Sequence, residues 1–213
     1  MWRQAGGRAD RASVWPIATA LIAGAALALH WLPGVAQVAE LDTRGRGPLA
    51  LVQLWTSHLT HFGGSHLTWD LAMFAVLGLV AERLAPTATR VLLAAGAPLI
   101  AVAVIGADPQ VLYYRGLSGV DTALFAFLAA HFAIDSEDAG RRRMGRIALA
   151  LLVARSIYEL GSGGTALFVD GAAGGFNTVP IAHVAGAVVG VVTAALAVPV
   201  ERGTRELRAA WSA

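Results

Sequence analysis

A serine between two glycines opens an apolar part of the chain. The stretch YYRGLSGVDTALF (residues 113–125) places Ser118 between Gly116 and Gly119, where a polar loop gives way to an apolar helix. A serine hydroxyl becomes a nucleophile when a neutral imidazole takes its proton, and free N–H groups at a helix N-terminus can stabilise the resulting oxyanion. The two glycines would permit a sharp turn and close approach of a substrate backbone. The alternative is a capping box, S-x-x-D, in which Asp121 caps the helix.

A histidine near the C-terminal end of the chain offers the matching base. His183 belongs to the stretch AHVAGAVVG (residues 182–190), and Gly186 and Gly190 follow it at i+3 and i+7, on one face of a helix. The small-xxx-small spacing of the two glycines lets membrane helices approach closely. We therefore predict that this helix packs against the helix of Ser118 and brings imidazole and hydroxyl within reach of each other.

Six apolar stretches must position these residues. The 213-residue chain is 56% hydrophobic and 14% charged, and its mean hydropathy is +0.61, whereas a membrane-spanning helix needs a run of about 17–25 apolar residues. The predicted spans are residues 14–32, 66–84, 90–105, 118–134, 147–160 and 180–200. We predict an all-α polytopic membrane protein, a six-helix bundle over residues 14–200 with tails at 1–13 and 201–213. Alternatively, the first span is a cleavable signal peptide, and its removal would leave five spans.

The arginines predict the orientation of the bundle. All 16 basic residues are arginine. With the N-terminus inside, twelve of them fall in inner segments and three in outer loops, which is a strong positive-inside bias. We therefore predict that both termini, and with them both tails, are cytoplasmic. The basic pI of about 9.7 then reflects topology rather than a nucleic-acid partner.

Four polar side chains fall at one depth in these predicted helices. Ser118 and His183 each lie sixteen residues from the inner end of their helix, which corresponds to about 24 Å. Asp70 and His66 lie about 20 and 26 Å from the inner end of the second helix. The hydrocarbon core is about 30 Å thick and polar groups inside it are costly. A shared layer of hydroxyl, imidazole and carboxyl groups therefore indicates a functional site.

These stretches resemble the rhomboid intramembrane serine proteases. GLSG (116–119) is similar to their G-x-S-G nucleophile motif, and AHVAGAVVG (182–190) to their H-x-x-G-x-x-x-G helix. SHLTHFGGSHLTWDLAMFAVLG (57–78) is similar to their second helix, which carries a histidine and, four residues later, an asparagine. The likeness spans roughly residues 50–195. Within the family, the compact six-span form, WTSHLTHFGGSHLTWD and the YEL of the fifth span most resemble the rhombosortase branch.

The resemblance implies a role for each matching residue. Ser118 would be the nucleophile and His183 the general base of a Ser-His dyad, with His66 as a donor to the oxyanion. The positions expected around the oxyanion are His66, Asp70, Gly116, Leu117 and Gly119.

Asp70 departs from the family pattern, because it stands where the family has asparagine. An ionised carboxylate would repel the oxyanion, so two states are open. In the first state, Asp70 is protonated through desolvation and donates a hydrogen bond. In the second state, it stays charged and orients His66. A further alternative is that Asp70 is the third member of a triad with Ser118 and His183.

Two other features lie in or next to the fifth span. Arg155 and Glu159 are spaced i, i+4, so they can neutralise each other. We expect a structural ion pair in the bundle interior, and recognition of a substrate tail is the alternative. The glycine-rich loop 161–179 would lie over the site, and we expect it to act as a gate for substrate and water.

We expect neither a metal nor a cofactor. Imidazole and carboxylate groups are metal ligands, but the spacings among the candidates fit no tight helical ligand pair. The candidates are His58, His61, His66, Asp70 and His183.

The resemblance as a whole implies an intramembrane serine endopeptidase in a bacterial inner membrane. Its partners would be the lipid bilayer and membrane-anchored substrates, cleaved in a transmembrane segment or at a Gly-Gly-type C-terminal sorting tail, with no nucleic acid involved. The alternative is a catalytically silent membrane protein of the same fold that binds transmembrane segments.

Overall fold

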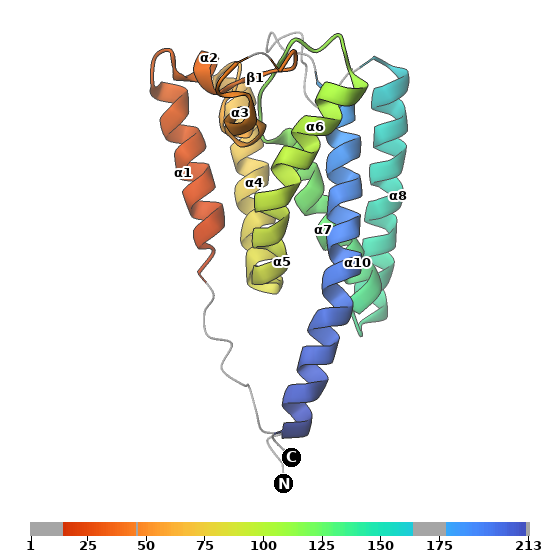
Figure 1. The fold of residues 1–213 in the computed structure, drawn as a ribbon. Coiled ribbons are helices and arrows are strands. Elements are labelled where there is room, and N and C mark those ends of the chain that lie inside the picture. Colours follow the sequence, from red (N-terminus) through yellow and green to blue (C-terminus); the bar gives the residue numbers. More distant parts are fainter. Residues whose placement is uncertain (1–14, 46, 164–177, 212–213) are drawn as a thin grey trace.

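Long helices lying side by side form the protein, as Figure 1 shows. The structure, a computed structural model, describes residues 15–45, 47–163 and 178–211. The helices of the bundle are α1 (Ile17–Trp31), α4 (Gly64–Leu84), α5 (Pro86–Val91), α6 (Ala97–Ala107), α7 (Ser118–Asp135), α8 (Ala139–Gly161) and α10 (Pro180–Trp211). This architecture agrees with the predicted helical membrane bundle.

Short elements gather at one end of the bundle, which we call the loop end. They are α2 (Val35–Ala39), β1 (Leu41–Asp42), α3 (Ala50–Thr56) and the 3-10 turn η1 (Ser57–Leu59). Strand β1 pairs antiparallel with β2 (Tyr113–Tyr114), which lies directly before the loop that leads into α7. Helix α10 begins at the same end, and α7 begins below it (Figure 1). The loop end therefore covers the start of α7.

One continuous helical run contains an irregular turn. Helices α5 and α6 are joined by the π-helical turn η2 (Leu92–Gly96), so the run extends from Pro86 to Ala107. Pro98 lies in the first turn of α6 and has no N–H, so it cannot donate to the carbonyl oxygen of Ala94. The indole Nε1 of Trp55, on α3, donates to that oxygen at 2.8 Å instead. A helix irregularity thus anchors the loop end to the bundle.

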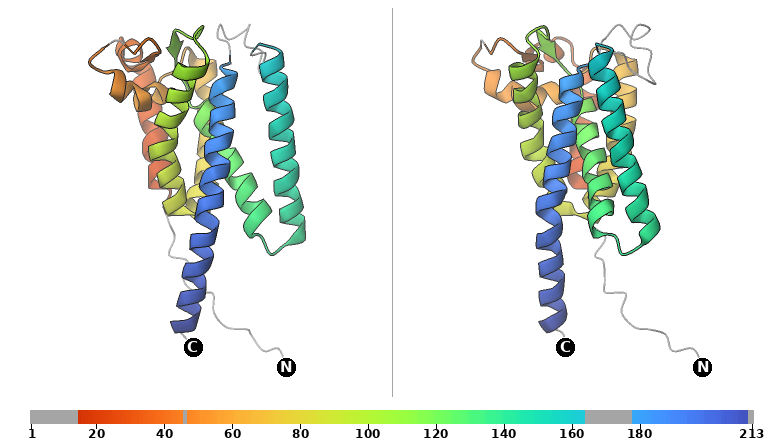
Figure 2. Two further views of the ribbon diagram at one scale, coloured as in Figure 1. Left: turned by 45° about the vertical axis from the view of Figure 1, so that its right-hand side comes forward. Right: turned by 90° about the vertical axis from the view of Figure 1, so that its right-hand side faces the viewer.

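Helix α7 is the centre of the bundle. It packs against α10, α8, α4 and α6, most extensively against α10 (Figure 2). A Cβ at Gly186 would collide with the carbonyl oxygen of Gly119, and a Cβ at Gly190 would collide with that of Ala123. The predicted close approach of these two helices is confirmed, because both glycines of α10 lie directly on the backbone of α7.

Helix α1 is held through a carboxylate from α4. Glu82, fully buried, accepts hydrogen bonds from the backbone N–H groups of Ala18 and Thr19 at 3.2 and 3.0 Å. These groups lie in the first turn of α1, where no intrahelical acceptor exists. Arg90 Nε lies 3.0 Å from the same carboxylate. Glu82 therefore caps α1 from another helix and is paired with a charge.

The predicted boundaries need several corrections. The third and fifth spans are longer than predicted, since their helical runs cover Pro86–Ala107 and Ala139–Gly161. Helix α10 continues to Trp211, so the described part of the predicted C-terminal tail is helical. By length and composition, the described helices able to cross a membrane are Pro86–Ala107, Ser118–Asp135 and Pro180–Thr204. The count of six spans and the side on which the termini lie stay predictions.

Candidate active site

The loop that leads into α7 is held on both sides of Gly116. Its N–H donates to the carbonyl oxygen of Ser57 at 3.1 Å, and its own carbonyl oxygen lies 3.3 Å from His58 Nδ1. Gly116 has φ +113°, a conformation that favours glycine. A Cβ there would lie 2.7 Å from His66 Nε2 and 2.9 Å from Asp70 Oδ2. Glycine is therefore required for both the turn and the close approach of α4.

Asp70 binds the residue that precedes the serine. Its Oδ2 accepts the backbone N–H of Leu117 at 2.8 Å. The Nε2 atoms of His61 and His66 each lie 3.2 Å from the same oxygen. A backbone N–H can only donate, so Asp70 Oδ2 is an acceptor at this position. Both states of Asp70 stay open, because a protonated carboxyl also keeps an acceptor oxygen.

The predicted capping box is wrong. Helix α7 begins with Leu117 as its N-cap residue, and no side chain makes a capping hydrogen bond there. Asp121 Oδ1 is buried and has no hydrogen-bond partner among the described residues. The helix begins one residue earlier than a Ser118–Asp121 box requires, because the Asp121 N–H already donates to the carbonyl oxygen of Leu117 and the N–H of Leu117 is bound by Asp70 from α4. Ser118, half-buried at the first position of α7, is thereby free of a capping role.

Helix α10 meets α7 directly beside the serine. A Cβ at Gly119 would lie 3.1 Å from the carbonyl oxygen of Ala182. Gly119 thus packs on Ala182, and these two residues are the chain neighbours of Ser118 and His183. The crossing brings these two chain positions next to each other on facing helices, about one helical turn below the start of α10.

His183 has a carboxylate partner that sequence reasoning missed. Its Nδ1 lies 2.6 Å from Glu159 Oε2, while the other oxygen, Oε1, accepts from Arg155 Nε at 2.9 Å. Glu159 and His183 are 1% and 2% exposed. The predicted pairing of Arg155 with Glu159 occurs, but the carboxylate also serves the imidazole. The sequence offered one signal for this contact. Glu159 lies near the end of α8 and His183 near the start of α10, so both lie at a similar depth in the bundle.

The other histidines do not join this group. His58 Nε2 lies 2.9 Å from the carbonyl oxygen of Ala97, and burial lowers the pKa of His58 to about 4. A neutral imidazole has one N–H, so His58 donates to only one of the carbonyl oxygens of Ala97 and Gly116, and the shorter contact favours that of Ala97 on α6, while the ring packs against the Gly116 carbonyl. His61 lies against Asp70. The histidines considered as metal ligands are therefore divided among three different partners.

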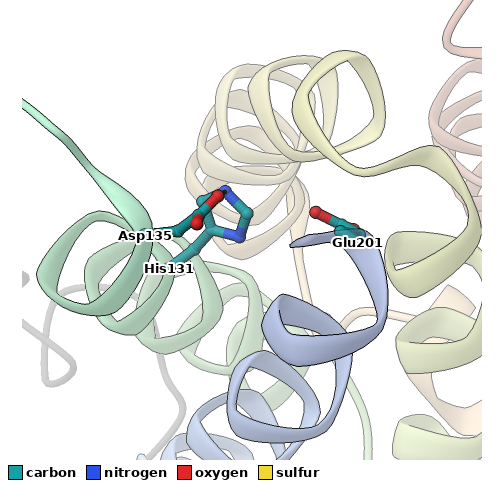
Figure 3. Close-up of side chains that lie close together, drawn as sticks. All are labelled: His131, Asp135 and Glu201. Carbon is teal, nitrogen blue, oxygen red and sulfur yellow. Dashed lines mark ion pairs between the residues drawn. The ribbon is translucent and has the colours of Figure 1, made fainter. Parts of the chain in front are cut away.

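A separate cluster of candidate metal ligands lies at the other end of α7. Figure 3 shows His131 and Asp135 from α7 beside Glu201 from α10, and their ligand atoms lie within 4.8 Å of one another. Asp135 Oδ1 is also 2.6 Å from Arg202 Nε. A divalent cation bound to Asp135 would face this guanidinium, so the arrangement favours an ion-pair link between α7 and α10. The thirteen residues between Ser118 and His131 correspond to about 20 Å, which separates the cluster from the serine.

Residues 164–177 of the loop 161–179, the predicted gate, lie outside the described residues.

Comparison with known proteins assigns the chain to a family. A family model described as the rhomboid domain matches residues 48–200, which run from just before α3 into α10. The match covers the loop end, the Gly116 loop and the crossing of α7 with α10. No curated protein matches the chain.

Proposed function

This chain belongs to the rhomboid family, and we propose that it is an intramembrane serine protease in which Ser118 is the nucleophile and His183 the general base. The observation that carries the proposal is the crossing of α7 and α10. A Cβ at Gly119 would lie 3.1 Å from the carbonyl oxygen of Ala182, and the residues next to these two in the chain are Ser118 and His183. Helix contacts this close leave little freedom in how the two residues face each other.

The proposed reaction proceeds through an acyl-enzyme. His183 takes the proton of the Ser118 hydroxyl while the serine oxygen attacks the scissile carbonyl carbon. The tetrahedral intermediate collapses, and the leaving amine receives that proton from His183. A water molecule, deprotonated by His183, then attacks the acyl-enzyme, and His183 returns that proton to the Ser118 oxygen as the second product leaves.

The start of α7 supplies donors for the oxyanion. In the first turn of a helix the backbone N–H groups have no intrahelical acceptor and carry the positive end of the helix dipole. We assign the N–H groups of Ser118 and Gly119 to the oxyanion, together with the His66 side chain. The N–H of Leu117 is excluded, since it donates to Asp70. Asp70 keeps His66 and the loop in position.

We further propose that the substrates are membrane-anchored proteins with a Gly-Gly-type C-terminal sorting tail, and that the enzyme acts in a bacterial inner membrane. The resemblance to the rhombosortase branch supports this narrower assignment. Small residues suit the site because a helical substrate must partly unwind before its backbone can approach Gly116 and Gly119.

A labelling experiment tests the assignment. A fluorophosphonate probe should label the wild-type protein in membranes and should fail to label Ser118→Ala or His183→Ala. Co-expression with candidate tail-bearing proteins should yield a mass shift with wild type alone. A folded wild-type protein that takes up no probe and cleaves no candidate would instead support a silent protein that binds transmembrane segments.

A further inference from the structure

We propose that Glu159 is a positioning residue that completes a Ser118–His183–Glu159 triad. The inference rests on the proposed function and adds a third group to the dyad. Each member comes from a different helix, since Ser118 lies on α7, Glu159 on α8 and His183 on α10.

The contact between Glu159 and His183 is short and shielded from solvent. The distance from Nδ1 to Oε2 is 2.6 Å, and the two side chains are 1% and 3% exposed. A carboxylate accepts, and Oε2 lies much closer to Nδ1 than Arg155 Nη2 does at 3.4 Å, so Nδ1 carries the hydrogen. This fixes the tautomer in which Nε2 has a free lone pair, and that tautomer is the one able to take a proton from a serine hydroxyl.

Arg155 holds the carboxylate in this orientation. Its Nε donates to Oε1 at 2.9 Å, which leaves Oε2 for His183. Both carboxylate oxygens thus have a partner, so the group cannot rotate without breaking a hydrogen bond. The arginine also compensates the buried negative charge while the imidazole is neutral.

Asp70 does not take this position. The groups around its Oδ2 are the Leu117 N–H and the rings of His61 and His66. His183 is instead engaged by Glu159 of α8. The two carboxylates therefore have separate tasks, one at the loop and one at the base.

The proton inventory of the triad balances without a proton on Glu159. The proton of Ser118 moves to His183 Nε2, and the hydrogen on Nδ1 stays in place, donated to Glu159. The imidazolium forms beside an ionised carboxylate, which stabilises it. The Nε2 proton then passes to the leaving amine and restores the starting state.

Glu159→Gln is the informative variant. Arg155 can only donate, so it should retain the amide oxygen and turn the NH₂ group toward His183 Nδ1. That NH₂ would favour hydrogen on Nε2, the tautomer that cannot act as base. We expect the rate of fluorophosphonate labelling at Ser118 to fall by about 10²–10⁴-fold, by comparison with the loss seen when an equivalent carboxylate becomes an amide in a serine protease. Glu159→Asp, which keeps the charge, should recover part of that loss.

Glu82→Gln is the matched control. Glu82 is likewise a fully buried glutamate paired with an arginine, Arg90, but it contacts α1 instead of His183. This variant should lower thermal stability without slowing the labelling of the protein that remains folded. An equal slowing in both variants would show that Glu159 acts through stability alone and would overturn the proposal.

A spectroscopic measurement needs no change at Glu159. In ¹⁵N-histidine spectra of the intact protein, with His183→Gln used for assignment, His183 should appear as the Nδ1–H tautomer. The Nε2–H tautomer would overturn the proposal even if the Glu159 variants do not fold. A wild-type protein that takes up no probe at Ser118 would contradict the proposed function, whereas normal labelling of a folded Glu159→Gln protein would contradict the triad alone.

Discussion

The indole N–H of Trp55 donates to the carbonyl oxygen of Ala94 at 2.8 Å. This oxygen has no helical donor, because the residue four positions later is Pro98, which has no N–H. This contact joins α3 to the π-helical turn. The following turn, η1, then holds Gly116 through Ser57 and His58. The loop before the serine is thus tied to a proline-induced irregularity in a helix that carries none of the proposed catalytic residues.

Trp55→Phe tests this tie. The change keeps the aromatic ring but removes the donor to the Ala94 carbonyl, and a typical hydrogen bond contributes about 0.5–1.5 kcal/mol net. We expect a lower unfolding temperature in detergent and slower labelling of Ser118. Trp69→Phe is the control, because Trp69 is an exposed indole on α4. Equal behaviour of the two variants would count against the role of Trp55.

Gly186→Ala should separate α10 from α7. The added methyl group would collide with the backbone carbonyl of Gly119, which cannot move aside as a flexible side chain could. We expect a loss of about 1–3 kcal/mol in stability from overpacking and a large loss of probe labelling.

Gly203→Ala on the same helix is the matched control for Gly186→Ala. A Cβ at Gly203 meets nothing within 4 Å. Alanine should stabilise the helix there by about 0.5–1 kcal/mol and leave labelling unchanged. If Gly186→Ala labels like the control, the crossing does not set the geometry of the site.

Asp70→Asn distinguishes the two states considered for Asp70. The charged role predicts a drop in labelling of about 10–100-fold, because charge-assisted hydrogen bonds contribute about 1.5–3 kcal/mol and each 1.36 kcal/mol is about tenfold in rate. Asp42→Asn, which breaks a surface pair with Arg44, serves as control. Full activity in Asp70→Asn would instead favour a neutral donor at this position.

His58 should make stability depend on pH. Burial lowers the pKa of His58 from 6.5 to about 4 in the folded protein. Above pH 6.5 the ring is neutral in both states and stability is complete. As the pH falls from 6.5 to about 4, the unfolded chain takes up a proton that the folded protein does not, so stability falls by up to about 3 kcal/mol.

The comparison that isolates this effect uses His58→Gln. The difference in unfolding free energy between wild type and variant should shrink as the pH falls through that window, measured by chemical denaturation in detergent. A difference that stays constant would mean that His58 is protonated in the folded protein as readily as in the unfolded chain.

A chelator should leave activity unchanged. The cluster of His131, Asp135 and Glu201 already has Arg202 at 2.6 Å from Asp135, and it lies far along α7 from Ser118. Labelling in EDTA should therefore equal labelling in buffer. Loss of labelling that zinc restores would instead point to a metal-dependent membrane enzyme.

The amino-acid sequence by itself determined the helices and the main candidates for chemistry. Apolar runs long enough for a bilayer predicted the bundle, and the glycines at i+3 and i+7 from His183 predicted a close helix crossing. These features are local, because helix period and hydrophobicity depend on residues within a few turns of each other. The family resemblance added the expected roles of Ser118 and His183.

Only the tertiary structure decided which carboxylate meets which polar group. Glu159 and His183 are 24 residues apart on different helices, and Asp70 and Leu117 are 47 apart. Their pairing depends on how α8, α10 and α4 are rotated and translated against α7, which no local pattern specifies. For the same reason the S-x-x-D spacing was misleading: the helix begins at Leu117, whose N–H is bound by a carboxylate from a distant helix, and Ser118 is not the N-cap residue.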